Sequence, residues 1–169
     1  MIKSTNENNL NFTGCDLHYH AETPCFDNNP STIKPETPRP VSVNGKRMPV
    51  IDMHAHCQLS NIWPMVEGRE ELKGENPYEG QLKKTENISV RLKQMDEMGT
   101  DIEVLSIGTE QHFPWADFEL ARDVATLQNE SLTEVCSANS DRFVPLGVVS
   151  LQHPHLAAEQ LEHSVKQLG

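Results

Sequence analysis

The sequence has 169 residues, of which 36% are hydrophobic, and a formal net charge of −11, so it describes a domain with a real core and an acidic surface. This charge balance disfavours binding to nucleic-acid phosphates and to anionic membranes, which both attract clustered Lys and Arg. The four cysteines form no CxxC pair, and no apolar run has the roughly 20 residues that span a bilayer, so we expect a cytoplasmic protein with reduced thiols.

The N-terminal residues 1–47 are rich in Asn, Pro, Thr and Ser. Such a composition buries too little apolar surface to offset the entropy of ordering, and it predicts a polar, flexible arm. A folded domain is then expected over residues 48–169. Its first element is the apolar run from Pro49 to His54, which is typical of a buried strand.

After a polar loop, helices and strands alternate along the domain. Ser89 is suited to cap a helix that ends at Gly99, and residues 102–107 predict the second strand. A helix from about Asp117, a strand over residues 143–149 and a helix beginning at Pro154 complete the order. The apolar side chains expected to face inward from the three helices are Leu92, Met95, Met98, Phe118, Ala121, Ala125, Leu132, Val135, Leu161, Val165 and Leu168.

The order β-α-β-α-β-α predicts parallel strands joined by helical crossovers, because strands in this order are buried under helices on both faces. The predicted fold class is α/β, of the (β/α)₈ TIM-barrel type. A complete barrel needs about 250 residues. We therefore expect a barrel truncated to about its first three βα units.

Chemistry concentrates at the end of the first predicted strand, in Asp52, His54 and His56. Residues two apart in a strand share a face, and barrel active sites lie at the C-terminal ends of the strands. Two imidazoles on one rigid strand are suited to bind a divalent metal such as zinc, and Asp52 is placed to accept the free N–H of one of them. The alternative is a pair of partly exposed histidines that bind no metal.

Three other histidine positions test this interpretation. His18 and His20 have the same spacing, but no apolar strand precedes them. His153 and His155 follow the third strand, where Pro154 favours the start of a helix instead. His112 lies in the loop after the second strand, so it is a candidate for substrate contact, with a solvated loop as the equal alternative.

Several segments resemble the amidohydrolase superfamily, and within it amidohydrolase family 2, the aminocarboxymuconate-semialdehyde decarboxylase-like branch. They are Ile51–His56, Arg91–Ser106, Asn129-Glu130 and Asp141–Gln152, and the resemblance extends from about Val50 to Gly169. It implies a TIM barrel with one divalent metal, usually zinc, that decarboxylates small unsaturated or aromatic carboxylates without oxidation. It also makes a homodimer an expectation.

The resemblance implies that His54 and His56 are metal ligands. It places the remaining ligands and the acid/base histidine beyond Gly169, so no catalytic residue is assigned in the chain, and the 169 residues alone are expected to be inactive. Two alternatives stay open: a metal-dependent hydrolase of a lactone or amide in the same superfamily, and a non-catalytic α/β fragment or binding module. Product analysis separates lyase from hydrolase.

Overall fold

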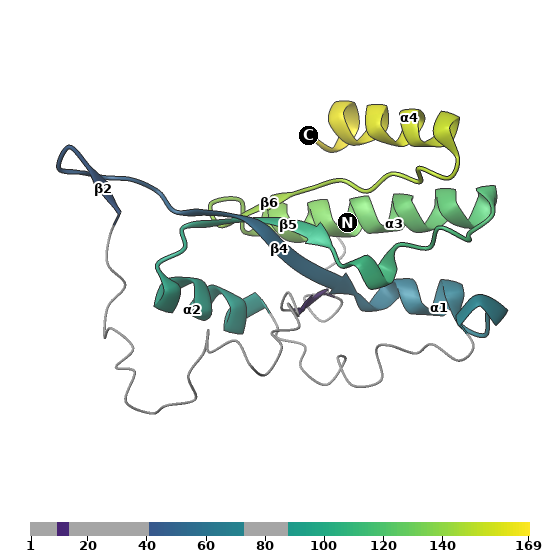
Figure 1. The fold of residues 1–169 in the computed structure, drawn as a ribbon, viewed down its shortest axis with the longest axis horizontal. Helices are drawn as coiled ribbons and strands as arrows, with labels where there is room; N and C mark the ends of the chain where they lie inside the picture. The colour runs from purple at the N-terminus through teal and green to yellow at the C-terminus, as the bar shows by residue number, and fades with distance from the viewer. Residues whose placement is uncertain (1–9, 14–40, 73–87) are drawn as a thin grey trace, which may run out of the picture.

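The computed structural model describes residues 10–13, 41–72 and 88–169, and its centre is a four-stranded sheet in the order β1-β4-β5-β6 (Figure 1). The strands are β1 (Leu10–Thr13), β4 (Ile51–Leu59), β5 (Ile102–Ile107) and β6 (Phe143–Pro145). β4, β5 and β6 are parallel, as the alternating pattern predicts, whereas β1 pairs antiparallel with β4. The described residues thus contain an open sheet of three parallel strands and one antiparallel edge strand, with connecting helices, and they do not form a closed barrel.

Local sequence signals set the helix boundaries. The helical segments are η2 (Ser60–Ile62), α1 (Trp63–Val66), η3 (Glu70–Leu72), α2 (Ile88–Met98), η5 (Thr109–Gln111), α3 (Phe118–Ala138), α4 (Pro154–His163) and η6, a π-helical turn (Ser164–Leu168). Asp117 caps α3 by accepting a 2.9 Å hydrogen bond from the backbone N–H of Leu120. Gly99 follows α2 with a φ of 78°, which is the left-handed conformation expected for the residue after a helix. None of the described helices is long and apolar enough to cross a membrane.

Part of the predicted N-terminal arm is structured. β1 belongs to the central sheet, and β2 (Ser42–Val43) pairs with β3 (Lys46–Arg47) in a short hairpin. Asn44 and Gly45 form its turn with φ values of 52° and 76°, the positive pair that a two-residue hairpin requires. These segments of the predicted arm thus form strands, whereas residues 1–9 and 14–40 lie outside the described part of the chain, so the flexibility of the arm stays a prediction.

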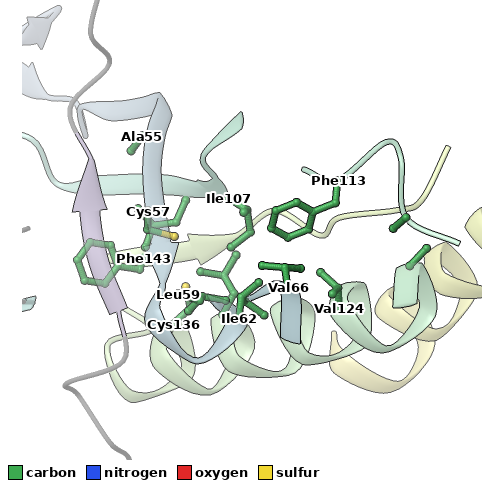
Figure 2. Packing of buried hydrophobic residues seen from close by; sticks show 14 of the residues in the cluster. Ala55, Cys57, Leu59, Ile62, Val66, Ile107, Phe113, Val124, Cys136 and Phe143 are labelled. Carbon is green, nitrogen blue, oxygen red and sulfur yellow. The ribbon is translucent and has the colours of Figure 1, made fainter. Parts of the chain in front are cut away.

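The hydrophobic core lies between one face of the sheet and helix α3 (Figure 2). Alternate residues of β4 (Ala55, Cys57 and Leu59) are buried, and so are Leu105 and Ile107 of β5. Their neighbours from the helices and from β6 are Ile62, Val66, Leu120, Val124, Leu132, Cys136 and Phe143. The core therefore fixes β4 and β5 rigidly against α3, and the opposite face of these strands is left to other residues.

Four of the side chains expected to face inward are exposed instead. Met98 is the last residue of α2, and Phe118, the first residue of α3, contacts the ring of His153. Leu161 and Val165 line a groove of about 300 Å³ between α4, η6, α3 and β6, which the described residues leave unfilled. Helix α4 buries Leu156, Ala157 and Gln160 in their place. The predicted strand over 143–149 is also shorter, because β6 ends at Pro145, which has no N–H for the sheet.

Candidate metal site

The imidazole rings of His54 and His56 converge at the middle of β4, on either side of Ala55. Their Nε2 atoms are 3.1 Å apart, and the ring planes meet at 79° with the centroids 4.7 Å apart. His54 is exposed and His56 is partly buried. The structure therefore brings together the two residues that the sequence predicts as ligands, with one nitrogen of each ring directed at the other.

A register shift in β4 precedes this pair. Asp52 lies opposite Glu103, and Ala55 lies opposite Leu105, so Met53 and His54 share the space of one residue on β5. Such a bulge interrupts the strict alternation on which the prediction for Asp52 was based. Oδ1 of Asp52 accepts a 2.9 Å hydrogen bond from the backbone N–H of His54, so here the carboxylate holds the main chain at the bulge. That Asp52 accepts a hydrogen bond from an imidazole N–H stays a prediction.

Ser106 of β5 is the residue next to His56 across the sheet. Its Oγ lies 2.8 Å from Nδ1 of His56 and 3.3 Å from the carbonyl oxygen of Ala55. No motif of the sequence marks this serine as part of the site. Only the pairing register reveals it, because a serine at an alternate position of a strand carries no signal of its own.

The protonation of His56 is shaped by its surroundings. Partial burial lowers the pKa of its imidazole, and the neighbouring His54 and His112 lower it further, while the Glu110 carboxylate raises it. Burial acts in this direction because it disfavours the charged ring. The neutral imidazole is the form that binds metals, so the environment of His56 favours the protonation state that a metal ligand needs.

The loop after β5 is tied to the end of β4. The buried side chain of Gln111 accepts a hydrogen bond from the backbone N–H of Leu59 and donates one to its carbonyl, both at 2.8 Å. Glu110 accepts a hydrogen bond from Nε2 of Gln58, which is also fully buried. These contacts fix the loop that carries His112 beside the strand that carries the two histidines.

His112 itself is exposed, and its Nε2 lies 3.4 Å from the carbonyl oxygen of Ile107. It is one of the residues that line a cavity of about 230 Å³, together with Phe113, Gln128, Ser150 and Gln152. Among the described residues, the lining of this cavity includes neither His54 nor His56. The predicted substrate contact of His112 stays a prediction.

The other histidine pairs lie apart from this site. His153 precedes α4, with its Nε2 3.0 Å from the carbonyl oxygen of Ala116 and its ring against Phe118. His155 is exposed in the first turn of α4, so this pair begins a helix, as Pro154 predicts. His18 and His20 lie outside the described residues.

The nitrogen pair fits one divalent ion. Two nitrogens that are each roughly 2.0–2.1 Å from one tetrahedral zinc ion lie about 3.3–3.4 Å apart, so the two Nε2 atoms, now 3.1 Å apart, would need to separate by only a few tenths of an ångström. In the described part of the chain, no group of three or more His, Cys, Asp or Glu side chains is placed to hold a metal. The metal site predicted at His54 and His56 therefore has only these two convergent nitrogens among the described residues, and their role as ligands stays a prediction.

Comparison with known sequences finds no matching family model. The chain is 38% identical over 80 residues to γ-resorcylate decarboxylase of Rhodococcus jostii, which covers 47% of this chain and 24% of that protein. It is 30% identical over 80 residues to 2-amino-3-carboxymuconate-6-semialdehyde decarboxylase of Dictyostelium discoideum, covering 47% and 22% respectively. The matched region therefore spans about a quarter of the length of these relatives.

Among solved structures, 2,6-dihydroxybenzoate decarboxylase from Rhizobium matches with a TM-score of 0.51 and 28% identity. The match covers 71% of this chain and 35% of that structure. It extends over more of the chain than the sequence matches do, so the similarity in backbone reaches beyond the similarity in sequence.

Proposed function

This chain is a relative of the γ-resorcylate and aminocarboxymuconate-semialdehyde decarboxylases, the branch of the amidohydrolase superfamily that its sequence resembles, and we propose that it carries two metal ligands of a non-oxidative carboxy-lyase. The observation that carries the proposal is the convergence of the Nε2 atoms of His54 and His56 to 3.1 Å. The proposed substrate is a small aromatic or unsaturated carboxylate, because the matched relatives are decarboxylases of such acids.

His54 and His56 would hold one divalent ion, for which we propose zinc because imidazole nitrogens suit it. When bound, such an ion supplies a Lewis acid that polarises a substrate oxygen. Asp52 holds the backbone of His54, and Gln111 holds the loop of His112, which we assign to substrate contact. The described residues supply no further group to which a proton transfer is assigned.

The architecture proposed for the site is the opening of a (β/α)₈ barrel. Support comes from the three parallel strands β4, β5 and β6. His54 and His56 flank Ala55 at the centre of β4, and the loop that carries His112 follows the C-terminal end of β5, the end of the strands where barrel active sites lie. Exposed apolar side chains occur at Ile51, Met53 and Val144 of the same strands, as expected for a surface that a complete barrel would bury. The cytoplasmic location and the homodimer stay predictions from the sequence.

Metal binding tests the proposal directly. Zinc is titrated calorimetrically into the 169-residue chain and into its His54→Ala and His56→Ala variants. The matched control is His155→Ala, which removes an exposed histidine remote from the pair. We expect His54→Ala and His56→Ala each to bind zinc roughly tenfold more weakly or worse, because removing even the hydrogen-bond partner of a ligand usually costs that much. The control should keep the original affinity.

Circular dichroism of each variant verifies that the fold is retained. Zinc affinity that is unchanged in both His54→Ala and His56→Ala would overturn the proposal, because the convergent nitrogens would then not be ligands.

A further inference from the structure

A hydrogen-bonded chain links His56 to the main chain through Ser106. Nδ1 of His56 lies 2.8 Å from Oγ of Ser106, and the same hydroxyl donates to the carbonyl oxygen of Ala55 at 3.3 Å. Ser106 is held opposite His56 by the parallel register of β4 and β5. The hydroxyl is thus fixed by the sheet and not by a mobile loop.

Two arrangements of protons satisfy the contact between the rings. In the first, His56 carries its proton on Nδ1 and donates to Ser106, whose hydroxyl donates to Ala55, while Nε2 of His54 donates to Nε2 of His56. In the second, Ser106 donates to Nδ1 of His56, and the proton between the rings belongs to His56. A hydroxyl has one proton, so the second arrangement gives up the bond to Ala55 and has one hydrogen bond fewer.

We infer that Ser106 is a positioning residue that holds His56 in the tautomer protonated at Nδ1 and leaves the lone pair of Nε2 available to a divalent ion. The part of this inference that concerns the ion rests on the proposed function, and the part that concerns the tautomer does not. Metal-binding histidines commonly donate their second ring N–H to a carboxylate, carbonyl or water. Here the serine hydroxyl passes that interaction to the carbonyl of Ala55.

The two histidines then differ before any ion arrives. His56 is partly buried and already presents a lone pair at Nε2, whereas the exposed His54 carries the proton between the rings. His54 has to give up that proton or rotate to become a ligand, and its exposure leaves it free to do so. His56 is therefore the prepared ligand and His54 the adaptable one.

The test uses a matched pair of variants, Ser106→Thr and Ser106→Val. Threonine keeps the hydroxyl, and valine has nearly the same shape without it, so packing changes are common to both. Long-range ¹H–¹⁵N spectra of the histidine rings in metal-free protein report which nitrogen of His56 is protonated. We expect the Nδ1 tautomer in the original chain and in Ser106→Thr, and a shift toward the Nε2 tautomer in Ser106→Val.

Zinc titration of the same variants gives the second measurement. We expect Ser106→Val to bind zinc about 10–100-fold more weakly than Ser106→Thr, the usual loss when the partner of a ligand is removed. The same His56 tautomer in both variants would overturn the inference, whatever the zinc affinity. Absence of zinc binding by the original chain, with the tautomer shift present, would overturn the proposed function and leave the assignment of the tautomer intact.

Discussion

The ion pair between Arg91 and Glu103 joins helix α2 to the sheet, and its removal gives the sharpest prediction for stability. The side chain of Glu103 is fully buried in β5, and Arg91 reaches both of its carboxylate oxygens, with Nε 2.9 Å from Oε2 and Nη2 2.7 Å from Oε1. Only 19% of the Arg91 side chain is exposed. Substitution Arg91→Met keeps the aliphatic stem and leaves the buried carboxylate without this cation.

Removing one partner of a buried ion pair costs about 3–5 kcal/mol, because the remaining charge is desolvated without compensation. Since Arg91 keeps some contact with water, we expect a loss near the lower end, about 3 kcal/mol. In a chain of this size 1 kcal/mol shifts the melting temperature by roughly 2–4 °C, so the Tm should fall by roughly 6–12 °C. Urea and thermal unfolding followed by circular dichroism measure both quantities.

Lys93→Met on the same helix is the matched control. Lys93 pairs with Glu97 at 3.9 Å, with 78% and 61% of the two side chains exposed, so its loss should cost at most about 0.5 kcal/mol. The double variant Arg91→Met/Glu103→Leu should recover most of the lost stability, because no buried charge remains. Equal melting temperatures for Arg91→Met and Lys93→Met, or a double variant as unstable as Arg91→Met, would refute the reasoning.

Three further predictions follow from the structure. Burial raises the pKa of the Cys57 thiol and raises that of Cys136 to about 12. In a variant whose two other cysteines are replaced by serine, both thiols should therefore resist a disulfide reagent at pH 8 until urea unfolds the chain, and rapid labelling of the native protein would contradict this. A side-chain hydrogen bond from Arg47, followed by the backbone N–H of Val50, lowers the pKa of Asp101. A carboxyl whose pKa is lower in the folded than in the unfolded state stabilises the folded state above the unfolded-state pKa, and this stabilisation is lost as pH falls through the folded-state pKa. The free energy of unfolding of Asp101→Asn should therefore approach that of the original chain as pH falls below about 4. A difference in free energy of unfolding that does not change with pH would disprove the assignment. Finally, the described residues offer two convergent nitrogens, whereas catalytic zinc usually has three protein ligands. The 169-residue chain with zinc should therefore release no carbon dioxide from 2,6-dihydroxybenzoate. Release above that of a protein-free buffer with zinc would show that the two nitrogens are sufficient.

Local signals predicted the elements whose ends depend on a single residue. The strand over 102–107, the start of α3 at about Asp117 and the left-handed Gly99 all follow from short-range preferences, and the structure confirms them. The position of β1 did not follow, because four residues in a polar segment become a strand only through pairing with β4. Nor did the exposure of Leu161, since a periodic apolar face does not reveal whether a partner surface is present.

The candidate site was predictable to the extent that it lies within one strand. The spacing of His54 and His56 placed both rings together, and their nitrogens do converge. Ser106 was not predictable, because its contact with His56 depends on the register between two strands. The carboxylate of Asp52 was assigned by counting residues in twos, and the bulge makes that count invalid.

The bulge in β4 changes which residues of the strand share a face. Before it, Ile51 and Asp52 follow one alternation, and after it Ala55 and His56 follow the alternation shifted by one residue. The two halves of the strand can thus vary independently, the first for packing and the second for ligand geometry. Deleting Met53 would leave only His54 opposite Val104, so the bulge would be lost while both halves kept their present partners and faces. Deleting one residue from the regular part after the bulge would instead shift the pairing by one residue and turn the side chains beyond it to the opposite face.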